Sequence, residues 1–268
     1  MSPQDTNALA PAMPDVQSSP DPREIAIDQV GIRDIRHPAR VLDSGRVQNT
    51  VALCTLTVGL PHDRKGTHMS RFVQMLNEAP LEISIAGLPA WLQAMAGRLE
   101  AGNARAEFRF PYFRDKPAPV SGVTSLLDYE VTLIGELDAQ GGRVRVRVVV
   151  PVTSLCPCSK EISEYGAHNQ RSHITVEAEV DGEFSLDTLI ATLEAQGSCE
   201  LYGILKRPDE KFITERAFDN PKFVEDMIRD VAGALNTLPG LRAYRAEVEN
   251  FESIHNHSAW ACIERRLR

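Results

Sequence analysis

Two runs of alternating residues, on either side of a long connection, place the strongest constraint on how this chain folds. Residues 143–150 are RVRVRVVV and residues 173–180 are HITVEAEV, so an apolar residue recurs at every second position in both runs. This period of two is typical of a strand with one buried face. The two runs therefore predict neighbouring strands of one sheet, joined by the residues between them.

The connection itself, residues 151–173, is long for a link between neighbouring strands, which indicates a functional loop. It carries Cys156 and Cys158 on either side of a proline that stiffens the turn. Gly166 allows the chain to bend so that the imidazole of His168 approaches the sulfur atoms. A thiolate beside an imidazole is typical of a transition-metal site or an activated nucleophile, whereas the cysteines alone would equally suit buried, unreactive thiols.

The rest of the chain repeats one order of elements. The first half predicts two strands, two helices and two strands, at residues 30–42, 51–60, 69–76, 88–99, 105–110 and 129–134. The second half predicts the same order, at residues 143–150, 173–180, 185–197, 221–235, 244–249 and 258–263. We therefore predict an α+β protein of two ββααββ units, residues 24–139 and 140–268, each an antiparallel sheet with helices on one face. Residues 1–23, rich in proline and polar residues, predict a disordered tail.

Composition narrows the classes of function. The chain has 29 basic and 37 acidic residues, a net charge of −8, so it has no global basic field for nucleic acid or an anionic membrane. It contains no apolar run of about 18 residues and no signal peptide, which predicts a soluble, cytoplasmic protein. Its five cysteines are sparse and odd in number, which favours reduced thiols over a disulfide framework.

Three further clusters carry residue types suited to ligands. The first, residues 205–211 (LKRPDEK), is predicted to be a loop whose basic groups suit phosphates and whose carboxylates suit a metal. The second is residues 252–257 (ESIHNH), where Glu252 faces inward if the strand from Tyr244 continues without a bulge. The third, residues 62–71, leads into a helix N-terminus that favours anions. Taken singly, each cluster also suits an ordinary solvated loop or helix cap.

Four segments together resemble the type IB GTP cyclohydrolase family, the prokaryotic form of the enzyme. They are SLCPCSKEISEYGAHNQRSH, LKRPDEKFITERAFDNPKFVEDM, FESIHNHSAWA and KGTHMSRF. The resemblance covers nearly the whole chain after the tail, and CPCSK followed by GAHNQR is its most distinctive part. It implies a tunnelling fold, in which ββααββ units of several subunits join into a barrel. It also implies a homotetramer with active sites at subunit interfaces.

The resemblance also implies roles for individual residues. It places a divalent metal on Cys156, His168 and Glu210, with Glu252 and His255 near enough to complete the coordination. Zinc suits this mixture of sulfur, nitrogen and oxygen, and iron and manganese remain open.

Other residues are expected to meet the substrate, GTP. By resemblance, Cys158 lies against the base and Glu225, otherwise an ordinary first-turn carboxylate, anchors the purine. His255 or His257 suits proton transfer because imidazole titrates near neutral pH. The basic residue types further suggest that the triphosphate is bound by Lys206, Arg207, Lys211, His68 and Arg71.

The expected reaction opens guanine at C8, releases formate and ends in 7,8-dihydroneopterin triphosphate, the first step of tetrahydrofolate biosynthesis or a supply for deazaguanine-modified tRNA. An alternative on the same type of fold is a nitrile reductase such as 7-cyano-7-deazaguanine reductase, with Cys156 or Cys158 as a covalent nucleophile and no metal. A second alternative is a zinc-stapled assembly module without activity. Formate release from GTP, as opposed to NADPH oxidation, separates the two enzymes.

Overall fold

The computed structural model describes residues 15–267, which form one ten-stranded sheet and six helices. The strands are β1 (Ile27–Asp43), β2 (Arg46–Leu60), β3 (Leu81–Ile83), β4 (Ala104–Pro117), β5 (Thr124–Asp138), β6 (Gly141–Leu155), β7 (Asn169–Val180), β8 (Cys199–Glu200), β9 (Leu241–Asn250) and β10 (Ala259–Arg266). The helices are α1 (Met69–Asn77), α2 (Leu88–Leu99), α3 (Pro157–Ile162), α4 (Leu186–Glu194), α5 (Arg207–Asp219) and α6 (Val224–Asn236).

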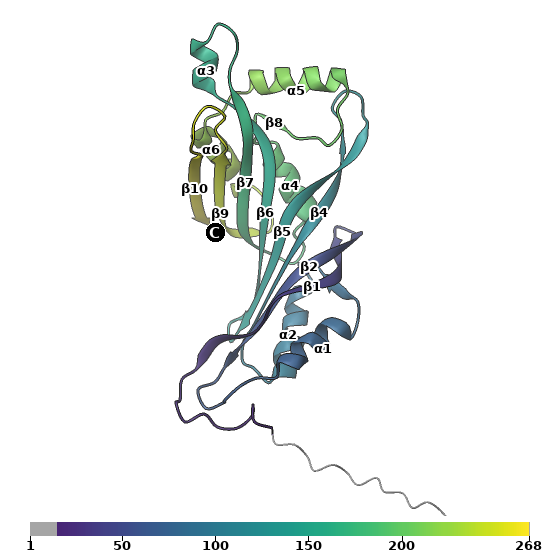
Figure 1. Ribbon diagram of the computed structural model, residues 1–268, viewed down its shortest axis with the longest axis vertical. Helices are drawn as coiled ribbons and strands as arrows, with labels where there is room; N and C mark the ends of the chain where they lie inside the picture. The colour runs from purple at the N-terminus through teal and green to yellow at the C-terminus, as the bar shows by residue number, and fades with distance from the viewer. Residues whose placement is uncertain (1–14, 268) are drawn as a thin grey trace, which may run out of the picture.

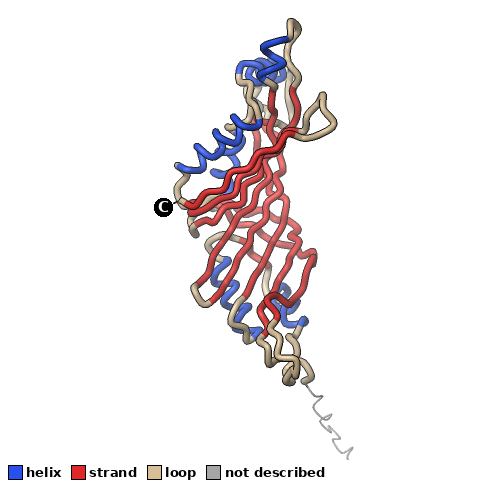
Figure 2. The backbone as a smooth tube through the Cα atoms, turned by 90° about the vertical axis from the view of Figure 1, so that its left-hand side faces the viewer, coloured by secondary structure: helices blue, strands red, loops and turns tan. Residues whose placement is uncertain are grey.

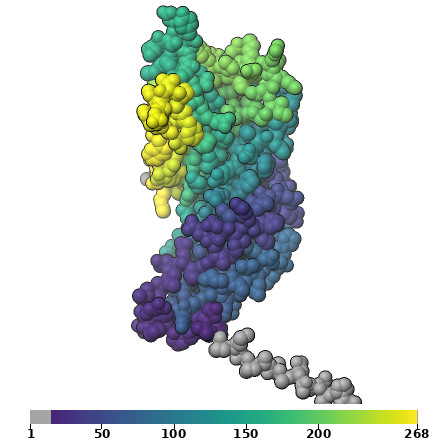
Figure 3. Space-filling view, in the orientation of Figure 1, coloured from purple at the N-terminus to yellow at the C-terminus, as the bar shows by residue number. Residues whose placement is uncertain are grey.

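The sheet is antiparallel except where the short β3 runs parallel to β1. Its order is β10-β9-β7-β6-β5-β4-β2-β1-β3, with β8 paired to β6. Strands β6 and β7 are neighbours, as the two alternating runs predict, and β5 pairs with β6 so that both halves of the chain share one sheet. The predicted boundary between the units lies in the turn between β5 and β6. The two halves follow one another along the long axis of the molecule (Figure 3), and helices lie towards both ends of the sheet (Figure 2).

Four helices cover one face of the sheet. Helices α1 and α2 pack on the first half, and α4 and α6 pack on the second half (Figure 1). Every second residue of β6 from Val144 to Val152 is buried beneath them. At Gly135 a Cβ atom would lie 2.7 Å from side-chain atoms of Leu88 and Leu92, so a residue without a side chain lets α2 approach β5. The prediction of an antiparallel α+β fold with helices on one face is confirmed.

Residues 205–211 are not the loop that the sequence predicts, because helix α5 begins at Arg207. This helix lies across one end of the sheet, beside α3 (Figure 1). Only Asp209 and Ala217 are buried along its length, so it lacks the apolar stripe by which a helix is recognised in a sequence.

The predicted tail falls partly outside the described residues, which begin at Asp15. Within the described part, the backbone of Gln17 and Ser19 accepts hydrogen bonds from Gly66 and Lys65, at 3.0 Å in each case. Over residues 15–267, no helix combines the length and the apolar character that crossing a membrane requires.

Candidate functional site

Cys156 and His168 face each other just beyond the last paired residues of β6 and β7. The pairing of Leu155 with Asn169 continues by one step, since the Cys156 N–H donates to the His168 carbonyl oxygen at 3.1 Å. Cα atoms of such a hydrogen-bonded pair lie about 5.5 Å apart, and the two side chains project to the same side of the sheet. The even-numbered residues of β6 from Val144 to Ser154 are buried on the helix-covered face, and Cys156, half-buried, takes the next even position.

The loop between the two residues is tied by Ser159. Its hydroxyl lies 3.2 Å from the His168 backbone N–H, from which it accepts, and 3.2 Å from the Cys156 carbonyl oxygen, to which it donates. Cys156 is the N-cap of the short helix α3, and Cys158 in that helix is exposed. Ser159 was not among the residues predicted from the sequence, and its place within the CPCSK motif is the signal that could have identified it.

The loop that follows β9 reaches the His168 ring. His168 Nδ1 lies 3.0 Å from Gln170 Oε1 and 3.3 Å from Ser253 Oγ. Strand β9 ends at Asn250, so the strand does not continue to Glu252, and the condition on which its inward direction was predicted is not met. Glu252 is half-buried there.

His255 and His257 lie further along the same loop and are exposed. Their rings stack with centroids 5.1 Å apart. Two predicted proton carriers therefore sit on the loop whose Ser253 touches the metal-ligand candidate His168.

The junction of α5 and α6 lies against the same end of the sheet. The Lys222 N–H donates to the Leu155 carbonyl oxygen at 3.0 Å, directly before Cys156. Glu225 follows three residues later in the first turn of α6 and is exposed. The structure thus brings the predicted purine anchor to the end of the sheet that carries the Cys156 and His168 pair.

Glu210 sits in the first turn of α5 and is exposed. It lies two helical turns from Phe218, whose carbonyl oxygen accepts from Lys160 of α3. Over the described part of the chain, no three His, Cys, Asp or Glu side chains converge closely enough to hold a metal. Glu210 therefore does not join Cys156 and His168 in a cluster of three within the described part of the single chain.

Of the remaining cysteines, Cys54 and Cys199 are buried in the core, and Cys262 is half-buried on β10. Burial raises the pKa of the Cys54 thiol to about 11 and also raises the pKa values of Cys199 and Cys262. A raised pKa leaves little thiolate at neutral pH, so these three thiols are poorly suited to nucleophilic or metal chemistry.

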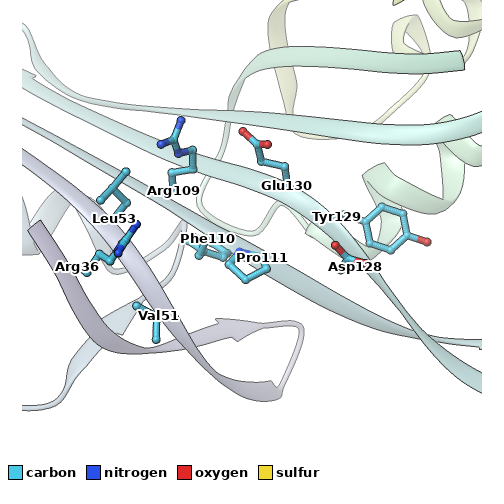
Figure 4. Close-up of a pocket in the computed structure, with 9 residues that line it drawn as sticks. All are labelled: Arg36, Val51, Leu53, Arg109, Phe110, Pro111, Asp128, Tyr129 and Glu130. Carbon is cyan, nitrogen blue, oxygen red and sulfur yellow. The ribbon is translucent and has the colours of Figure 1, made fainter. Parts of the chain in front are cut away.

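A hollow on the other face of the sheet is not part of this site. It is lined by side chains from β1, β2, β4 and β5, among them Arg36, Arg109 and Glu130 (Figure 4). Glu130 pairs with Val149 of β6. Odd-numbered residues of β6 face away from the side of the even-numbered ones, so Glu130 and Val149 lie on the face opposite to Cys156. The hollow offers arginine and carboxylate groups but no cysteine or histidine.

Comparison with known proteins identifies the family. A family model described as type I GTP cyclohydrolase folE2 matches residues 13–261. The protein named GTP cyclohydrolase FolE2 from Azoarcus sp. (strain BH72) is 59% identical over 263 residues, and that from Thiobacillus denitrificans is 58% identical over 260 residues. Each match covers 97% of both chains.

This chain belongs to the type I GTP cyclohydrolase FolE2 family.

The fold of this FolE2 family member is also found in uricases. A hyper-thermostable uricase mutant aligns with a TM-score of 0.52 over 89% of this chain and 92% of its own, at 7% identity. A uricase from Bacillus fastidious aligns with a TM-score of 0.51 over 90% and 93%, also at 7% identity. At such low identity the likeness concerns the fold alone.

The predicted triphosphate contacts of the FolE2 family member fall into two separate groups. Lys206, Arg207 and Lys211 are exposed at the start of α5, where Lys211 pairs with Glu215 at 2.8 Å. His68 and Arg71 lie instead at the start of α1 in the first half, away from α3 and the Cys156 end of the sheet (Figure 1). One chain alone does not bring these two groups together.

Proposed function

We propose that this protein hydrolyses GTP at C8 of the guanine, releasing formate and forming 7,8-dihydroneopterin triphosphate, the first step of tetrahydrofolate biosynthesis. Membership of the FolE2 family supports the reaction. The observation that carries the proposal is the pairing of Cys156 with His168 at the end of β6 and β7. Water addition to an unactivated ring carbon needs an activating centre, and a thiol beside an imidazole supplies the ligand types for one.

The donor set fits a divalent metal of the zinc, iron or manganese class. Cys156 Sγ and His168 Nε2 are the proposed first ligands, and Glu210, Glu252 and His255 are the proposed further ones. Glu252 and His255 lie on the loop whose Ser253 contacts His168, which supports their inclusion. When bound, such a metal supplies Lewis-acid activation of water at neutral pH.

The chain's own residues bind the substrate and move protons. Glu225 accepts hydrogen bonds from the N–H edge of guanine, and Cys158 lies against the base. His255 or His257 transfers protons to and from the opening ring, because imidazole titrates near neutral pH.

The triphosphate requires several cations, and two groups are proposed to supply them. Lys206, Arg207 and Lys211 extend from the start of α5, and His68 and Arg71 from the start of α1. Since these groups lie apart in one chain, the complete site forms between subunits.

A homotetramer built by joining sheet edges into a barrel accounts for this arrangement. Strand β10 ends the sheet on one side, and β3 with β1 ends it on the other. Unpaired edges present free N–H and C=O groups to another chain. The assembly and a cytoplasmic location are predictions of the sequence that fit this function.

The decisive experiment incubates the metal-loaded protein with GTP and follows both formate and the fluorescence of oxidised neopterin. We expect both products with zinc, iron or manganese, none after chelation, and none with ATP, which lacks the guanine N–H edge. A folded, metal-loaded sample that produces neither compound with any of the three metals would refute the proposal. NADPH-dependent reduction of a deazaguanine nitrile would then be assayed.

A further inference from the structure

A row of buried polar side chains lies directly behind His168. On the helix-covered face, β6, β7 and β9 carry apolar residues along most of their length and change to polar residues near their ends. The four members of this row, which we call the amide–hydroxyl relay, are Gln170 (8% exposed), Ser154 (0%), Ser172 (0%) and Asn250 (3%). Buried polar groups in a core require an explanation, because apolar residues would fill the same space without the free-energy cost of removing polar atoms from water.

The relay runs without interruption from His168 to the end of β9. His168 Nδ1 lies 3.0 Å from Gln170 Oε1, and Gln170 Nε2 donates to Ser154 Oγ at 2.7 Å. The Ser154 and Ser172 hydroxyls are 2.8 Å apart, and Ser172 Oγ lies 2.7 Å from Asn250 Oδ1.

The relay has one direction. Asn250 Oδ1 can only accept, so the single hydroxyl proton of Ser172 is donated to it. Ser172 must then accept from Ser154, which in turn accepts from the Gln170 amide. The Gln170 carbonyl oxygen is therefore turned toward His168, and the ring nitrogen that faces it must carry a proton.

We propose that the relay fixes the tautomer of His168, with Nδ1 protonated and the lone pair of Nε2 presented to the metal. Gln170 is thus a positioning residue for the proposed metal centre, and this inference rests on the proposed function. A neutral imidazole donates one nitrogen to a metal only when the other holds the proton. Because Asn250 directly precedes the loop of Glu252 and Ser253, the relay also connects the two segments that carry proposed ligands.

The test compares Co²⁺ binding by the full-length protein with that of its variants. The thiolate-to-cobalt absorption reports ligation by Cys156, so affinity is measured without turnover. Gln170→Leu fills the same space without an acceptor, and we expect it to weaken Co²⁺ binding by about 10–100-fold. Gln170→Glu keeps an acceptor in place and is expected to retain the affinity. Gln48→Leu makes the same chemical change on β2, where Gln48 exchanges two hydrogen bonds with the backbone of Phe113, and is expected to bind Co²⁺ as the unchanged protein does.

Two results would overturn the proposal. One is unchanged Co²⁺ affinity in Gln170→Leu, and the other is an equal loss in Gln170→Glu, which would reduce Gln170 to a packing role. His168→Ala separates this failure from failure of the proposed function. If the unchanged protein binds Co²⁺ no more tightly than His168→Ala, the metal centre itself is wrong.

Discussion

The chemical difference between the cysteines arises from where each lies in the sheet. Cys54 is fully buried on β2, and its burial raises the pKa of the thiol to about 11. Cys156 is half-buried at the open end of β6, opposite His168, where several chain segments meet. Position at the end of a strand therefore separates a thiol suited to ligation from one suited to packing.

Removing either member of the Cys156 and His168 pair tests this difference. We expect Cys156→Ala and His168→Ala to remain folded but to lose bound metal and formate release from GTP. Metal content after dialysis and circular dichroism measure the two properties. Cys54→Ala removes a thiol from the core and is expected to keep its metal. Full activity in either of the first two variants would exclude that residue from the centre.

At the scale of an element, helix α5 is held by one buried carboxylate. Asp209 accepts from the backbone N–H groups of Val120, Ser121 and Lys206 at 2.8 Å each, and from the Ser121 hydroxyl at 2.6 Å. Burial alone would raise the pKa of Asp209, but these hydrogen bonds outweigh it and lower the pKa below its usual value. Asp209 thereby joins the β4–β5 turn to the helix that carries Glu210.

We expect Asp209→Asn to lower the melting temperature at pH 7, because an amide cannot accept from all of these donors. A carboxyl with a lowered pKa stabilises the fold above its unfolded pKa of about 3.9 and loses that contribution as the pH falls. The difference in melting temperature between the variant and the unchanged protein should therefore shrink below about pH 4. Glu210→Gln, one residue along and exposed, is the control and should melt as the unchanged protein does. A constant difference across this pH range would contradict the assignment.

At the scale of the whole molecule, a buried ionic cluster joins the two halves of the chain. Glu194 of α4 accepts from Lys116 at 2.8 Å, from Arg114 at 3.0 Å and from the Tyr129 hydroxyl at 2.6 Å. The Glu194 side chain is 5% exposed. Burial, together with the neighbouring Glu194, raises the pKa of Tyr129, so its hydroxyl stays protonated and donates.

Glu194→Ala would leave the buried Lys116 charge without its carboxylate partner and Arg114 with Asp187 alone. We expect a loss of about 3–5 kcal/mol in the free energy of unfolding, measured by denaturant titration. Glu215→Ala breaks an exposed pair with Lys211 and is expected to cost about 0–1 kcal/mol. If Glu194→Ala does not fold, Glu194→Gln, which keeps the shape, should still be measurably destabilised. Equal stability of the Glu194 and Glu215 variants would show that the cluster does not hold the halves together.

The sequence by itself determined the eight longer strands, the buried faces of β6 and β7 and the backbone pairing of Cys156 with His168, but not the short strands β3 and β8. Alternation with a period of two is a local property, and two strands joined by one loop bring the ends of that loop together. The motif CPCSK followed by GAHNQR also pointed to the correct family.

Only the tertiary structure decided helix α5, the amide–hydroxyl relay and the Glu194 cluster. Ser172 and Asn250 are 78 positions apart, and Lys116 and Glu194 are likewise 78 apart. Such contacts leave no periodic trace in the sequence, because they depend on which strands become neighbours and not on the residues adjacent in the chain. The position of Glu210, which the family resemblance places with Cys156, is likewise set by helix α5, and Glu210 joins no three-residue cluster among residues 15–267.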